Sequence, residues 1–128
     1  MKSLKILIAD DDRHVRKALR LRLSAWGYEV VESIDGLGVI ERVTPENIDA
    51  LVLDHEMPNG DGRTVAHLIR RETDAPIIFL SGHDRSEFLS TALRLPDVYY
   101  LNKPLEAERL KNLLDSYFAP KSRRIVPV

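Results

Sequence analysis

The sequence LKILIADDD, residues 4–12, combines an apolar run with a cluster of acidic residues. Residues 4–9 form a short, largely apolar run with β-branched members, and three consecutive aspartates end it abruptly. A short apolar run of this kind is typical of a strand that is buried on both faces of a parallel sheet. We therefore predict a buried strand at residues 4–9 with acidic side chains at its carboxyl end.

Strand-like and helix-like segments alternate along the rest of the chain. Four further short apolar runs predict strands at residues 28–32, 50–53, 76–80 and 98–101. Apolar residues at helical spacing predict five helices, marked by Val15, Leu19 and Leu23, by Leu37, Ile40 and Val43, by Val65, Leu68 and Ile69, by Phe88, Leu89, Ala92 and Leu93, and by Leu110, Leu113, Leu114 and Tyr117. Because right-handed crossovers place each helix against the sheet, the alternation predicts a doubly wound α/β fold with helices on both faces of a five-stranded parallel sheet.

Size and composition limit the domain count and the classes of partner. A chain of 128 residues with 44% hydrophobic content fits one compact domain. Its formal net charge of -1 provides no global basic field that would attract nucleic acid or an anionic membrane. The absence of cysteine excludes a disulfide framework, a thiolate nucleophile and a Cys-ligated zinc site. No signal peptide or transmembrane pattern is recognisable, so we expect a cytoplasmic domain over residues 1–118 and a tail or linker over residues 119–128.

Polar side chains follow four of the five predicted strands. They are Asp10, Asp11 and Asp12 after the first strand, Asp54 after the third, Ser81 after the fourth and Lys103 after the fifth. The carboxyl ends of parallel strands lie at one edge of the sheet, where such folds carry their sites. Two carboxylates about 4 Å apart repel each other by roughly 4 kcal/mol near a protein surface, so this acid cluster needs a compensating cation. Magnesium, or manganese, suits a site of carboxylate oxygens.

An acid cluster of this kind also suits phosphoryl transfer. With a divalent cation in place, one carboxylate can act as a nucleophile toward phosphorus and form an acyl phosphate. The oxygens of that phosphate need donors, and the Lys103 ammonium and the Ser81 hydroxyl fit this role. An alternative is that the aspartates at residues 10–12 only cap a helix and complement its dipole, but Asp54 and Lys103 favour the site.

These motifs resemble those of response-regulator receiver domains of two-component signal transduction. The resemblance covers about residues 4–118 and rests on four motifs. They are ILIADDD (6–12) with VR (15–16), LVLD (51–54) with MP (57–58) and DG (61–62), Ser81 after IIFL (77–80), and KP (103–104) after YYLN (99–102).

The resemblance implies a strand order, a site and a switch. It implies the CheY-like order 2-1-3-4-5, phosphorylation of Asp54 by a histidine kinase, and magnesium held by Asp10, Asp11, Asp54 and the backbone carbonyl of Glu56. Ser81 would move toward the phosphate and the aromatic ring of Tyr100 would turn inward. The Lys103-Pro104 bond would be cis, which would aim Lys103 into the pocket.

Other features of the resemblance concern regulation and partners. Glu56 and His83 match two variable positions beside the phosphoryl group, so they are expected to tune how fast the phosphate is lost. The implied partners are a sensor histidine kinase or phosphotransfer protein, a downstream protein target, and a second copy of the chain in a phosphorylation-dependent homodimer. Beyond self-phosphorylation and dephosphorylation no enzyme activity is implied. The segment Leu95-Pro96-Asp97 departs from the small Gly-Ala turn that is common before the fifth strand.

Three alternative functions remain. A receiver excised from a larger regulator would continue into an output domain, although the ending at Val128 favours a stand-alone receiver. A pseudo-receiver would bind partners without phosphorylation, but it would have no need of a self-repelling acid cluster. A flavodoxin-like nucleotide binder would need a Gly-rich or hydroxyl-rich loop after the first strand in place of three aspartates.

Overall fold

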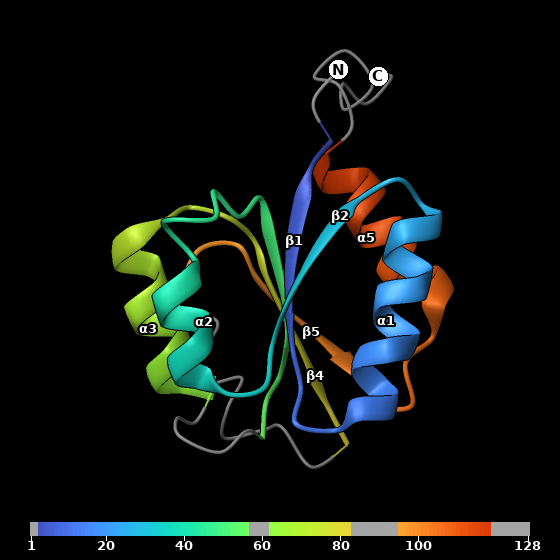
Figure 1. The fold of residues 1–128 in the computed structure, drawn as a ribbon, viewed down its shortest axis with the longest axis horizontal. Coiled ribbons are helices and arrows are strands. Elements are labelled where there is room, and N and C mark those ends of the chain that lie inside the picture. Colours follow the sequence, from blue (N-terminus) through green and yellow to red (C-terminus); the bar gives the residue numbers. More distant parts are fainter. Residues whose placement is uncertain (1–2, 57–61, 83–94, 119–128) are drawn as a thin grey trace, which may run out of the picture.

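A computed structural model of the protein describes residues 3–56, 62–82 and 95–118 (Figure 1). The elements in these ranges are β1 (Lys5–Ala9), α1 (Arg13–Ala25), β2 (Glu29–Ser33), α2 (Gly36–Arg42), β3 (Ala50–Asp54), α3 (Gly62–Glu72), β4 (Ile77–Ser81), β5 (Val98–Asn102) and α5 (Ala107–Phe118). The five predicted strands are thus confirmed, with ends that shift by a residue. Four of the predicted helices are confirmed as well, whereas the one expected around residues 88–93 lies outside the described residues.

The strands form one parallel sheet in the order β2-β1-β3-β4-β5, as predicted. Figure 1 shows α2 and α3 on one side of this sheet and α1 and α5 on the other. The side-chain alternation within β1 serves both layers, since Leu7 packs in the core under α2 and α3 while Ile6 and Ile8 pack in the core under α1 and α5. The fold is therefore a doubly wound α/β sandwich of three layers.

Local sequence explains both ends of α1, the helix that follows the acidic run. Asp12 is the N-cap, because its carboxylate accepts hydrogen bonds from the backbone N–H groups of His14 and Val15. The chain leaves the helix through Gly27, whose φ of 95° is a conformation that glycine adopts without a Cβ clash. One of the three aspartates thus has the capping role considered above.

The central strands place the polar residues at a rim. All five residues of β3 and all five of β4 are buried, so these strands are covered on both faces. Their last residues, Asp54 and Ser81, end at the same edge of the sheet as Asp10 after β1 and Lys103 after β5. No helix within the described ranges is long and apolar enough to cross a membrane.

Candidate functional site

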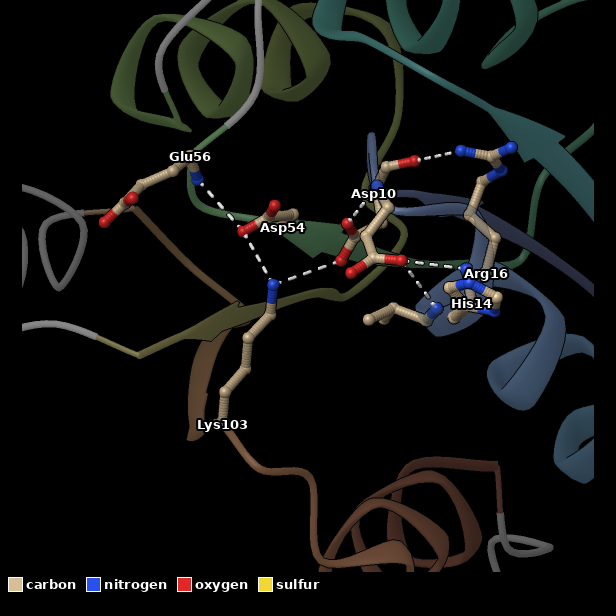
Figure 2. A network of polar contacts seen from close by, with 8 residues as sticks. Asp10, His14, Arg16, Asp54, Glu56 and Lys103 are labelled. Carbon is tan, nitrogen blue, oxygen red and sulfur yellow. Dashed lines mark hydrogen bonds and ion pairs between the residues drawn. The ribbon is translucent and has the colours of Figure 1, made fainter.

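The site is built at the carboxyl edge of the sheet from residues that end three strands. Figure 2 shows Asp10, Asp54 and Lys103 converging at this edge. Backbone hydrogen bonds align the ends of β3 and β5 with the end of β4. The N–H of Lys103 donates to the carbonyl of Ser81 at 2.8 Å, and the N–H of His55 donates to the carbonyl of Leu80 at 2.9 Å. Parallel strand pairing therefore brings these polar side chains together.

Lys103 connects the two buried carboxylates. Its Nζ lies 3.2 Å from Oδ2 of Asp10 and 3.2 Å from Oδ1 of Asp54. The Asp10 and Asp54 side chains are 1% and 7% exposed, whereas that of Lys103 is 29% exposed. Partial burial opposes the charged ammonium, but the hydrogen bonds and charges of the two aspartates outweigh it and raise the pKa of Lys103. Lys103 thus stays protonated at neutral pH and offsets part of the acid charge.

The environment of Asp10 disfavours its ionised form. Burial and the nearby charge of Asp54 raise its pKa, despite opposing contributions from the Asp12 N–H, which donates to Oδ1 at 2.8 Å, and from Lys103. The pKa values of Lys103 and Asp10 are therefore both raised, with opposite consequences for charge. Lys103 is stabilised as a cation, whereas the charge of the buried Asp10 carboxylate is not fully compensated by Lys103. A further cation near Asp10 would favour its ionised form.

The donor set fits magnesium. One carboxylate oxygen from each of Asp10, Asp11 and Asp54 lies within 4.8 Å of the others, and Asp11 is exposed while the other two are buried. Such a group offers hard oxygen ligands and an open side toward solvent, which suits an ion that keeps several of its waters. The backbone of Glu56 lies beside this acid group, because its N–H donates to Oδ1 of Asp54 at 3.1 Å. Metal binding through its carbonyl stays a prediction.

Arg16 also belongs to the site, although no role for it is predicted from the sequence. Its Nη1 donates to the backbone carbonyl of Asp10 at 2.8 Å (Figure 2). Its Nε lies 3.7 Å from Oε1 of Glu32. Glu32 also pairs with Arg20 at 3.0 Å. Arg16 therefore ties the backbone that carries Asp10 to α1 and β2. In the sequence Arg16 is marked only as part of the VR pair (15–16) in the motif that follows the acidic run.

The residues of the predicted switch lie on two neighbouring strands. Ser81 ends β4 and is 2% exposed. Tyr100 is half-buried in the middle of β5 and packs against the core under α2 and α3, whereas Tyr99 packs on the opposite face. The Lys103-Pro104 bond is cis, in agreement with what the family resemblance implies. His83 lies outside the described residues.

Comparisons with known proteins agree with this geometry. The family model described as "Response regulator receiver domain" matches residues 6–115. Response regulator MprA of Mycobacterium ulcerans (strain Agy99) is 39% identical over 109 residues, which cover 84% of this chain and 47% of that protein. The chain spans less than half the length of the curated relatives it matches, such as 42% of the probable transcriptional regulator ycf27 of Galdieria sulphuraria.

Solved structures share the fold. A two-component response regulator from Clostridium difficile superposes with a TM-score of 0.83 at 26% identity, over 88% of this chain and 93% of that one. The receiver domain of sensor histidine kinase PA1611 from Pseudomonas aeruginosa PAO1, with a magnesium ion coordinated in its active site cleft, superposes with a TM-score of 0.78 at 24% identity, over 89% and 96% of the two chains. The two structures thus share the fold of this protein over nearly nine tenths of its chain.

Proposed function

The chain belongs to the response regulator receiver domain family of two-component systems, and from this premise we propose that Asp54 accepts a phosphoryl group from a histidine kinase or a phosphotransfer protein. The observation that carries the proposal is the contact of one ammonium, that of Lys103, with both buried acids at 3.2 Å. Lys103 offsets part of the acid charge at this rim of the parallel sheet, and a bound divalent cation would offset more, so that a phosphoryl group could approach Asp54 there.

The proposed reaction is a displacement at phosphorus. A carboxylate oxygen of Asp54 attacks the phosphorus of a phosphohistidine, so that a new O–P bond forms as the N–P bond breaks. The imidazole leaves with the electron pair of the broken bond, and it is neutral when its other nitrogen carries a proton. The product is an acyl phosphate on Asp54, which makes the chain a phosphate acceptor and signalling module.

Protein side chains receive the charge of the new phosphate. Lys103 already contacts Oδ1 of Asp54, so its ammonium needs little movement to donate to a phosphoryl oxygen. The Ser81 hydroxyl at the end of β4 supplies a further donor. Magnesium held by Asp10, Asp11, Asp54 and the carbonyl of Glu56 would neutralise phosphoryl and carboxylate oxygens when bound. Asp10 remains as an acid that holds Lys103 in place.

The proposed output is a change of shape that begins at Ser81 and Tyr100. Movement of Ser81 toward the phosphate would open space into which the Tyr100 ring turns, and a bias of a few kcal/mol is enough to shift such an equilibrium. The partner that recognises the changed conformation would be a downstream protein, a second copy of the chain, or an output domain of a longer protein of which residues 1–118 are the receiver. We place the domain in the cytoplasm, where its kinase would meet it.

The lifetime of the phosphate is proposed to depend on Glu56 and His83. The acidic side chain of Glu56 follows Asp54 by two residues and is exposed, so it adds negative charge near the attacking water. Replacing both residues by alanine and timing phosphate loss tests this. An unchanged lifetime would contradict the proposal for these two positions and leave the role of Asp54 untouched.

The central experiment measures intact mass after incubation with magnesium and acetyl phosphate. The wild type is expected to gain one phosphoryl group only when magnesium is present, and Asp54→Asn is expected to gain none. Asp12→Asn is the matched control, because asparagine caps α1 as well as aspartate does and should leave uptake intact. If the wild type gains no mass while turnover is blocked, the chain is a phosphorylation-independent interaction module.

A further inference from the structure

His55 occupies a position between the phosphate acceptor and the predicted switch. It directly follows Asp54, and its backbone continues the sheet because its N–H donates to the carbonyl of Leu80 at 2.9 Å. Side chains alternate along a strand, and Leu51 and Leu53 pack under α2 and α3. The His55 side chain therefore lies on that same face, opposite to the face toward which Asp54 points.

The His55 ring is held in an aromatic group with Phe79 and Tyr100. Its centroid lies 6.1 Å from that of Phe79 in an edge-to-face arrangement at 88°, and 6.2 Å from that of Tyr100 at 56°. Phe79 and Tyr100 are themselves paired in register across β4 and β5. Aromatic pairs at such distances prefer particular relative orientations, so the position of one ring restricts the others.

The first residue of α3 makes room for this ring. A Cβ at Gly62 would lie 2.6 Å from Cδ2 of His55 and 3.1 Å from Cε1 of Phe79, so a larger residue would displace the histidine. The helix thus closes over the ring at the distance that only glycine allows. The half-buried His55 ring therefore lies beside the start of α3 on one side and beside Tyr100 on the other, so a movement of either ring changes the packing of both.

The backbone after His55 is tied to the reacting carboxylate. The N–H of Glu56 donates to Oδ1 of Asp54 at 3.1 Å, and the same oxygen lies 3.2 Å from Nζ of Lys103. Phosphorylation of Asp54 changes the charge and the hydrogen-bond acceptors at this point. The peptide that joins His55 to Glu56 is therefore hydrogen-bonded to the carboxylate that phosphorylation would modify.

We propose that His55 is a positioning residue that transmits phosphorylation of Asp54 to the ring of Tyr100. This inference rests on the proposed function and adds a physical connection to it through chain continuity on one side and ring packing on the other. Because the coupling is carried by the shape of a planar ring, phenylalanine at position 55 should retain it, whereas alanine or leucine should lose it.

The test follows the Tyr100 ring directly by fluorine NMR of protein labelled with 3-fluorotyrosine. The Tyr100 resonance is assigned as the one missing from Tyr100→Phe. Beryllofluoride with magnesium serves as the phosphoryl mimic. The wild type is expected to show a shift of this resonance on addition of the mimic, and most of that shift should be lost in His55→Ala and His55→Leu but retained in His55→Phe. His67→Ala, an exposed histidine on α3, is the control and should behave as wild type.

Each result decides the inference. It is overturned if Tyr100 responds equally in His55→Ala and wild type, or if His55→Phe fails to preserve the response. His55→Leu keeps the side-chain volume and so provides the comparison if the alanine variant does not fold. Phosphoryl uptake from acetyl phosphate is measured on the same proteins. Uptake without any Tyr100 response in the wild type overturns the role of His55 alone, whereas absence of uptake overturns the proposed function.

Discussion

The ammonium of Lys103 donates a hydrogen bond of 3.2 Å to Oδ2 of Asp10, a residue 93 positions earlier in the chain. Their strands are not neighbours, because β3 and β4 lie between β1 and β5. The long lysine side chain therefore crosses the rim of the sheet and meets Asp54 on the way. The negative charge of Asp10 and Asp54 is therefore offset by a single long side chain, that of Lys103, which follows the edge strand β5.

Removal of that cation is expected to destabilise the metal-free protein. Lys103→Met should lower the free energy of unfolding at pH 7 by about 1–3 kcal/mol, since two buried carboxylates lose a charged donor. The loss should shrink when magnesium is added. Urea unfolding of both proteins with and without magnesium measures this. Lys111→Met, which breaks only an exposed pair with Asp115, is the control and should cost about 0.5 kcal/mol or less.

Asp10→Asn is expected to stabilise the metal-free protein at neutral pH. Because burial and Asp54 raise the pKa of Asp10, ionising this group costs more in the folded state than in the unfolded state. The wild-type protein therefore has its full free energy of unfolding while Asp10 is protonated in both states, below the unfolded pKa of about 4. This free energy falls as pH rises through the higher folded pKa of Asp10. The gain from asparagine should therefore be present at pH 7 and vanish near pH 3 in urea titrations. A variant that is less stable than wild type at pH 7 would contradict this electrostatic assignment.

Asp11 should matter for metal binding and not for the metal-free fold, because it is the exposed member of the acid group. Asp11→Asn is expected to unfold like wild type without magnesium. In excess magnesium it should lose part of the metal-induced stabilisation, by about 1.4 kcal/mol for each tenfold weakening of affinity. Thermal unfolding over a magnesium series measures both values. Asp12→Asn is the matched control, and an equal loss in this control would show that only the summed negative charge matters.

Arg70 should stabilise the opposite edge of the sheet. Its guanidinium donates to the carbonyls of Thr73 at 2.7 Å and Ala75 at 2.6 Å, and to those of Pro96 at 3.0 Å and Asp97 at 3.3 Å. It thereby joins the end of α3 to the turn before β5, where Asp97 has a φ of 54°. This is the turn that departs from the usual pattern of receivers.

Arg70→Lys is expected to lower the free energy of unfolding by about 1–3 kcal/mol, because lysine cannot satisfy these carbonyls in the planar geometry of arginine. Phosphoryl uptake should not change, since the group lies away from the acid rim. Arg71→Lys, at the exposed neighbouring position, should have no measurable effect on either quantity. Equal free energies of unfolding for the two variants would contradict the prediction that Arg70 stabilises the fold through these hydrogen bonds.

The polar rim was predictable because it depends on local pattern. An apolar run marks a buried strand, and the residue that ends the run marks the carboxyl edge, so Asp10, Asp54 and Lys103 could be placed at one edge without coordinates. Arg16 was not predictable in this way. Its contact with the Asp10 carbonyl depends on how α1 rotates against β1, which no spacing in the sequence specifies.

His55 and Arg70 show the same limit. In the sequence His55 is one of four scattered histidines without ligand spacing, and only the packing of α3 against the sheet brings its ring to Phe79 and Tyr100. Arg70 is one basic residue among several near the end of a helix, and its carbonyl partners come from two separate turns. Both roles arise from neighbours that are distant in sequence.

Three properties could be predicted from the amino-acid sequence alone. They are the alternation of strands and helices, the acidic, hydroxyl and basic residues at the strand ends, and the family that these motifs resemble. These properties follow from periodicity and residue type, which are read over a few positions at a time. The contacts between distant residues required the three-dimensional fold. They are Lys103 between two acids, Arg16 on the Asp10 carbonyl, and the His55 ring beside Tyr100. Such contacts depend on strand register and helix packing, because these set the distances between residues that are far apart along the chain.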